Sequence, residues 1–179
     1  LVIDAAHETA IAQLAKSLPV RFDGGRVYLG NEDVTDAIRT EEAGMNASRV
    51  SALPSVRTAL VDLQHGFQRL PGLVADGRDM GTVIFPDAPL KVFLTASAAC
   101  RAERRYKQLI SKGFQANIDD LRADLEARDA RDSSRSVAPL KPAQDALVLD
   151  NSTLTIEQAV NQVMNWWLER QPFAAPAQG

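Results

Sequence analysis

Residues 73–89 read LVADGRDMGTVIFPDAP. The apolar run LVA (73–75) breaks off at DGRD (76–79), where two carboxylates and an arginine surround a glycine. This pattern predicts a buried strand that ends in charged residues, and ligands of open α/β sheets bind at the carboxyl ends of their strands. An Asp-Gly turn that only ends a strand fits the same letters. The stretch alone therefore leaves a ligand site and a simple turn both open.

Two more apolar runs, residues 90–94 and 146–149, are separated by long helical stretches. Short apolar strands that alternate with helices are typical of a parallel sheet covered on both faces, so we predict an α/β fold. Residues 19–72 have another rhythm. Alternating apolar positions around a DGG turn (23–25) predict a β-hairpin, and helices broken near Pro54 follow it. We predict an α+β insert there, preceded by a helix over residues 4–18.

Several helices have start signals in the sequence. Asn117 is a predicted N-cap, Ser55 is another, and Thr155 with Gln158 fits a capping box. The apolar stripe predicted to face the core on the last helix consists of Ile156, Ala159, Val160, Val163 and Trp167.

Composition excludes some classes of function. The chain has 179 residues, a net charge of −3 and a sequence pI of about 5.4, so no overall basic field points to a nucleic-acid partner. Cys100 is the only cysteine, which excludes an intrachain disulfide. The chain has no run of about 18 apolar residues, and its two histidines lack the spacing of metal ligands. We therefore expect a cytoplasmic monomer without a membrane partner or a metal site of its own.

The segment NIDDLRADLEARDARDSSR (117–135) places arginines where a core-facing stripe should continue. Its residues at helical spacing fall within an arc of roughly 100°; they are Ile118, Leu121, Leu125, Arg128, Asp132 and Arg135. Arg131 flanks the same face. Arginines on a core-facing side need an anionic partner, and phosphate suits the guanidinium fork. Surface pairs at i,i+4 spacing, such as Arg128 with Asp132, are the alternative.

A second basic cluster follows the apolar run 90–94 and comprises Arg101, Arg104, Arg105 and Lys107. A helix with several cations that ends at a glycine, here Gly113, could close over a phosphate as a lid. A solvated helix face fits the same pattern. No G-x-x-x-x-G-K-[ST] motif occurs, so these 179 residues contain no phosphate-binding P-loop.

Several strings along the chain match one family. The most specific are DGRDMGT (76–82) and a spaced block made of RDARD (128–132), Arg135 and APL (138–140). With shorter matches elsewhere, they resemble bacterial cytidylate kinase from about Leu1 to the final helix. The resemblance implies the P-loop nucleoside monophosphate kinase fold, in which an enlarged insert binds the nucleoside monophosphate.

The activity that the resemblance implies is transfer of the ATP γ-phosphoryl group to CMP or dCMP, with ATP as co-substrate and Mg²⁺ as cofactor. Carried over by position, Ser48, Arg57 and Asp79 are similar to the residues that read cytosine. This set is chemically coherent, because cytosine offers an amino donor and two acceptors. A carboxylate, an arginine and a hydroxyl can answer all three.

The phosphate and sugar contacts carry over in the same way. Arg78 is similar to a residue that holds the monophosphate, and Arg135 is similar to one near the phosphates. Arg128 and Asp132 resemble the pentose contacts. Phosphoryl transfer needs positioning and charge neutralisation more than a covalent nucleophile. The cations expected to neutralise the transferring group, the catalytic set, are Arg101, Arg104, Arg105 and Arg131.

The family begins with a strand, a P-loop and a helix, and we expect that part to lie upstream of Leu1. Without it, ATP binding should be very weak, and the neighbours of a central strand should lose a partner. We expect the parent protein to be the kinase, and this chain alone to be inactive or to bind only CMP, with no tightly bound cofactor. A related kinase for another monophosphate is an alternative, as is a non-catalytic nucleotide-binding fragment or an interaction scaffold whose arginines form only salt bridges.

We predict four segments along the chain. A residual core helix covers residues 1–18, and the insert covers 19–72. The core α/β domain covers 73–171, with its lid at about 101–117, and a flexible tail follows over 172–179.

Overall fold

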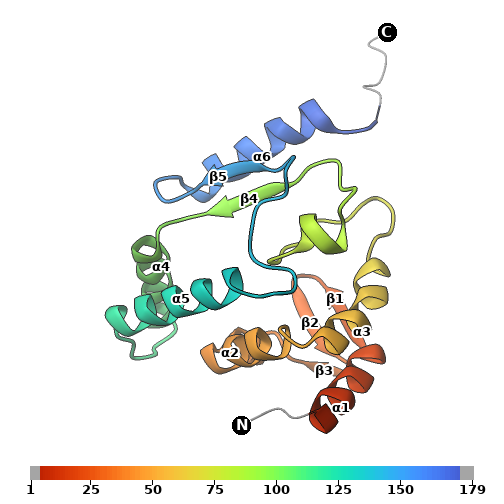
Figure 1. Cartoon of the computed structure of the whole chain (residues 1–179). Helices are drawn as coiled ribbons and strands as arrows, with labels where there is room; N and C mark the ends of the chain where they lie inside the picture. The colour runs from red at the N-terminus through yellow and green to blue at the C-terminus, as the bar shows by residue number, and fades with distance from the viewer. Residues whose placement is uncertain (1–4, 174–179) are drawn as a thin grey trace. The chain divides into compact units, whose positions relative to one another are not determined.

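The computed structural model describes residues 5–173 and divides the chain into two compact units, Leu1–Ala75 and Asp76–Gly179 (Figure 1). Most of the tail predicted over residues 172–179 lies outside the described residues, as do residues 1–4. The assignment of functional domains within the two units stays a prediction.

The first unit contains a small antiparallel sheet in the order β1-β2-β3. Strand β1 (Val20–Asp23) pairs with β2 (Arg26–Leu29), which pairs with the short β3 (Glu32–Asp33). The two residues between β1 and β2, Gly24 and Gly25, have φ of 55° and 79°. Two successive positive φ angles are what a two-residue hairpin turn of type I′ requires, and glycine adopts them without steric cost. The predicted hairpin is confirmed.

The helices of the first unit are α1 (Ala5–Lys16), the 3₁₀ turn η1 (Ala37–Arg39), α2 (Glu41–Val50) and α3 (Pro54–His65). Helix α1 packs beside α3, where Ala15, Val56 and Ala59 form a buried core (Figure 1). The prediction that Ser55 caps α3 is wrong. Proline occupies the first helical position because its missing N–H costs nothing there, and the Ser55 hydroxyl donates instead to Glu8 of α1 at 2.6 Å.

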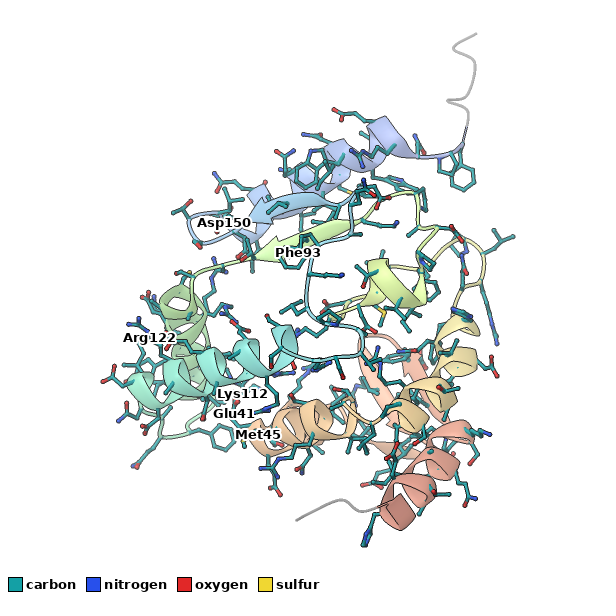
Figure 2. The ribbon with its side chains drawn as sticks, viewed as in Figure 1. Glu41, Met45, Phe93, Lys112, Arg122 and Asp150 are labelled. Carbon is teal, nitrogen blue, oxygen red and sulfur yellow. The ribbon has the colours of Figure 1, made fainter. Side chains whose placement is uncertain are left out.

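The second unit is built around two parallel strands, β4 (Val92–Thr95) and β5 (Leu147–Asp150). Val92 pairs with Leu147 in register, and Figure 2 labels Phe93 and Asp150 on the two strands. Helices α4 (Ala98–Ser111) and α5 (Ile118–Ser133) connect the strands and lie side by side, and α6 (Ile156–Arg170) follows β5. The mixture of helices with a parallel sheet agrees with the predicted α/β class.

Two of the predicted helix caps are confirmed. The Asn117 side chain accepts a hydrogen bond from the Asp119 N–H at 2.8 Å, and Thr155 forms a complete capping box with Gln158. The predicted core-facing stripe of α6 is partly wrong, because Ile156 is 86% exposed and Val160 is also exposed. Within the described residues, no helix has the length and apolar character that a membrane crossing requires.

The strand predicted over residues 73–75 is wrong. These residues form no strand, and Val74 is 99% exposed. Within residues 5–173, β4 pairs with β5 alone, so its other edge has no strand beside it. An apolar run becomes a strand only where a neighbouring backbone takes up its N–H and C=O groups. The described chain supplies no such neighbour at this position.

Candidate functional site

Asp132 lies at the centre of a cluster of three arginines, Arg78, Arg128 and Arg135. Its carboxylate is only 1% exposed, near the end of α5. The Nε of Arg78 donates to its Oδ2 at 2.9 Å, and Nη2 of Arg135 donates to its Oδ1. The Nε of Arg128 lies 3.9 Å from Oδ2. Arg78 comes from the DGRD segment, so the structure joins the two motifs that the sequence singled out.

Asp132 keeps its charge in this environment. Burial is the largest single influence on the pKa of Asp132 and raises it. The hydrogen bond from Arg78 and the charges of Arg135 and Arg78 together outweigh burial, so the pKa lies below its ordinary value. The carboxylate is therefore ionised at neutral pH. Three arginines around one carboxylate leave an excess of two positive charges.

Two guanidinium groups of this cluster have unused donors. The Nε atoms of Arg128 and Arg135 are buried and have no hydrogen-bond partner. The Arg135 side chain is only 8% exposed, so water replaces the missing acceptor poorly. A buried donor without an acceptor costs free energy, of the order of 1–3 kcal/mol. A ligand that brings acceptor oxygens and negative charge, as a phosphate does, would remove this cost.

The DGRD segment leads directly into a π-helical turn, η2 (Met80–Ile84). The backbone carbonyl of Asp79 accepts hydrogen bonds from Thr82, Val83 and Ile84 at 3.3, 2.9 and 3.3 Å. The Asp79 side chain is buried. Single π-helical turns occur frequently at functional sites, and here the turn holds the backbone that carries Asp79. No sequence signal predicted it.

Gly77 has a packing role. A Cβ at this position would lie 3.0 Å from Cγ of Met80, closer than side chains normally pack. The Met80 side chain therefore lies over the glycine.

The arginines of α4 are engaged by neighbouring elements of the second unit. Arg101 donates to both carboxylate oxygens of Asp129 on α5, and its Nε donates to the Ala96 carbonyl at 3.1 Å. Arg104 donates to the side chain and the backbone carbonyl of Asn151, which follows β5.

Arg105 and Arg131 are the two remaining members of the predicted catalytic set. Arg105 donates to Gln108 of the same helix at 2.7 Å, in a contact that the structure leaves exposed. Arg131 is exposed in the last turn of α5. The structure therefore gathers the predicted cations on α4 and α5, two helices that pack against each other.

The first unit contains the other two predicted base-reading residues. Ser48 is buried on α2, and Arg57 on α3 donates from Nη1 to the Ser51 carbonyl at 3.1 Å. The Ser51 hydroxyl donates to the Ser48 carbonyl at 3.1 Å. Ser51, just after α2, thus links Ser48 to Arg57. The structure brings these two candidates into one local arrangement.

Asp129 and Asn151 are the residues of these contacts that the sequence analysis missed. Their partners lie 28 and 47 positions away in the chain, too far for any local spacing rule to connect them. Among residues 5–173, no three His, Cys, Asp or Glu side chains gather in a way that could hold a metal ion.

Comparison with known proteins decides the family. The cytidylate kinase family model matches residues 2–168. The chain belongs to the cytidylate kinase family. It is 58% identical over 172 residues to the cytidylate kinase of Cupriavidus necator, covering 96% of this chain and 78% of that protein.

Two further relatives agree. The cytidylate kinase of Bordetella bronchiseptica is 58% identical over 165 residues, which cover 92% of this chain and 74% of the relative. That of Burkholderia mallei is 59% identical over 160 residues, which cover 89% and 70%. The resemblance drawn from DGRDMGT and RDARD is confirmed. The roles assigned to single residues stay predictions.

Proposed function

We propose that this chain serves the transfer of the ATP γ-phosphoryl group to CMP or dCMP, giving CDP or dCDP, and that the Asp132 cluster binds the acceptor nucleotide. The observation that carries the proposal is the pair of buried, unpartnered Nε atoms on Arg128 and Arg135. They lie in a cluster with two excess positive charges, which suits the phosphate or sugar oxygens of a nucleotide.

We assign the roles of the arginines in this cluster by the N–H donors that Asp132 leaves unused. Arg78 and Arg135 each donate to Asp132, and each retains N–H groups that can reach a phosphate. Asp132 orients both arginines while it balances part of their charge. We assign Arg78 and Arg135 to the monophosphate, and Arg128 with Asp132 to the pentose.

The base-reading assignment rests on the family resemblance. Ser48, Arg57 and Asp79 are the groups proposed to recognise cytosine. A carboxylate accepts from the exocyclic amino group, while an arginine and a hydroxyl donate to the ring nitrogen and the carbonyl. Uracil has a carbonyl in place of the amino group, so a carboxylate such as Asp79 should disfavour UMP.

In the reaction, an oxygen of the acceptor phosphate attacks the γ-phosphorus of ATP, and the bond to the leaving ADP oxygen breaks. The protein's contribution is to align the two phosphates and to neutralise their charge. Arg101, Arg104, Arg105 and Arg131 are the cations proposed for this second task. Mg²⁺ is commonly bound through the substrate phosphates with only one or two carboxylates, so it would arrive with the nucleotide.

A second candidate function is binding of CMP without turnover. These 179 residues contain no G-x-x-x-x-G-K-[ST] motif, and that loop is the part of a P-loop kinase that cradles the donor phosphates. We propose that the fold's first strand and P-loop are not supplied by these residues. The chain alone should then hold the acceptor and turn it over poorly.

Calorimetry with CMP, dCMP, UMP and ATP tests the proposal, together with an assay of ADP formation beside the Cupriavidus necator relative. We expect CMP to bind more tightly than UMP, and ADP formation far below that of the relative. Turnover equal to that of the relative would contradict the binding-only alternative. Absence of CMP binding would contradict the proposed acceptor site.

Arg135→Lys tests the cluster directly. It keeps the charge but removes the planar fork, so CMP affinity should fall about tenfold. Arg122→Lys is the matched control, because Arg122 is an exposed arginine on α5, the helix that precedes Arg135 in the chain; it is paired with Glu126 and labelled in Figure 2. If both variants bind CMP as the wild type does, Arg135 does not contact the ligand.

A further inference from the structure

Arg101 and Asp129 form a two-pronged ion pair between α4 and α5. Nη1 of Arg101 donates to Oδ1 of Asp129 at 3.1 Å, and Nη2 donates to Oδ2. The third bond, from Nε to the Ala96 carbonyl at 3.1 Å, ties the same guanidinium to the segment between β4 and α4. Three bonds to two different elements fix a planar group in position and in rotation. A single salt bridge would leave it free to swing.

This arrangement leaves part of Arg101 available. A guanidinium has five N–H donors, of which three are used here. The remaining two, one on each Nη, have no partner within residues 5–173. The side chains of Arg101 and Asp129 are 30% and 34% exposed, so a ligand can reach the pair while water only partly screens it.

The Asp129 side chain has no other hydrogen bond or ion pair within residues 5–173. It lies on α5 between Arg128 and Arg131, in the part of the helix that leads to the Asp132 cluster. An acidic residue there weakens the positive field that attracts a phosphate. Its presence is therefore unfavourable for anion binding unless it contributes by orienting a neighbour.

We propose that Asp129 is a positioning residue that holds Arg101 with its two unused N–H groups presented to the phosphate chain of the donor nucleotide. The inference rests on the proposed phosphoryl transfer and deepens it, because it gives Asp129 a role that neither the residue pattern nor the family resemblance assigned. Asp129 itself does not touch the ligand.

The direction in which Asp129→Asn changes the affinity for an anion distinguishes a positioning role from a purely electrostatic effect. Asp129→Asn removes one negative charge next to several arginines, so electrostatics alone predicts tighter anion binding. If Asp129 positions Arg101, the same substitution weakens binding although the field becomes more favourable. Asp124→Asn is the matched control, since Asp124 is exposed on the same helix and forms no ion pair with another residue of the part of the chain that the structure describes.

The test follows the arginine Nε–Hε signals of the chain by ¹⁵N NMR during titration with inorganic tripolyphosphate, which measures even millimolar affinities. The Arg101 signal is assigned from its loss in Arg101→Lys. In the wild type we expect an ordered Arg101 signal that shifts on titration. In Asp129→Asn this signal should lose order, and the affinity should fall about fivefold or more.

Asp124→Asn should bind tripolyphosphate as tightly as the wild type or slightly more tightly, and Asp129→Glu should recover part of the loss. The proposal is overturned if Asp129→Asn binds as tightly as the wild type, or if the wild-type Arg101 signal does not respond to tripolyphosphate. Titration of the same samples with CMP keeps the two questions apart. Failure of CMP to bind the wild type argues against the proposed function, whereas retained CMP binding with an unaffected Asp129→Asn variant argues against this inference alone.

Discussion

Replacing Asp132 with asparagine should destabilise the second unit strongly, because it removes the negative charge that Arg78 and Arg135 share. The side chain keeps its size, so the loss is electrostatic. Removing one partner of a buried ion pair typically costs 3–5 kcal/mol, since the other charge stays buried and uncompensated. The Arg135 side chain is 8% exposed, so its charge would remain buried without a partner. The Arg78 side chain is 38% exposed, so water would solvate part of its charge.

We therefore expect Asp132→Asn to lower the free energy of unfolding by about 3 kcal/mol, the lower end of that range. For a unit of about 100 residues, 1 kcal/mol corresponds to about 4–8 °C in Tm, so the Tm should fall by about 12 °C or more. Both tryptophans, Trp166 and Trp167, lie on α6 of the second unit. Their fluorescence during urea unfolding reports on that unit rather than on the first.

Two companions make the measurement decisive. Asp124→Asn changes the same residue type on the exposed part of the same helix and should shift stability by no more than about 0.5 kcal/mol. Adding Arg135→Met to Asp132→Asn removes the orphaned cation and should recover part of the loss. An Asp132→Asn variant within about 0.5 kcal/mol of the wild type would falsify the view that Asp132 neutralises a buried cluster.

Three further outcomes follow from the structure. The lowered pKa of Asp132 stabilises the folded state fully above the unfolded carboxyl pKa of about 3.9, and this stabilisation is lost as the pH falls through the lower folded pKa. The free energy of unfolding, followed by fluorescence, should therefore fall less steeply with decreasing pH in Asp132→Asn than in the wild type. Equal slopes would contradict this. Gly25→Ala forces a side chain into a φ of 79° and should cost about 1–2 kcal/mol, visible as faster amide exchange across β1 and β2, whereas unchanged exchange would exclude strain at the turn. Thr155→Ala removes the cap of α6 and should cost about 1 kcal/mol by tryptophan fluorescence; Thr155→Ser, which keeps the hydroxyl, serves as its control.

Features with short-range causes could be read from the sequence. The hairpin follows from alternating residues around Gly24-Gly25, and the starts of α5 and α6 follow from Asn117 and Thr155. Each cap joins a side chain to a backbone group two or three residues away. The sequence motifs DGRDMGT and RDARD also predicted the family correctly, because they are specific to it.

Apolar character alone was an unreliable guide to burial. The run at 73–75 has the letters of a buried strand, yet Val74 is almost fully exposed because no described strand lies beside it. Ile156 and Val160 have helical spacing on α6, yet both are exposed. In each case burial depends on whether another element covers the residue, and residue type does not encode that.

By itself, the sequence determined the family, the parallel strand pair, the hairpin and the helix starts, because these depend on motif identity or on interactions over a few residues. It also identified Arg78, Arg128, Asp132 and Arg135 as candidates. Only the tertiary structure decided how they meet. Arg78 reaches Asp132 across 54 positions, and Arg101 reaches Asp129 across 28, because packing of the elements brings distant positions within hydrogen-bond reach. Tertiary packing also decides which arginines have N–H groups without an acceptor, because the acceptors come from residues that are distant in the sequence.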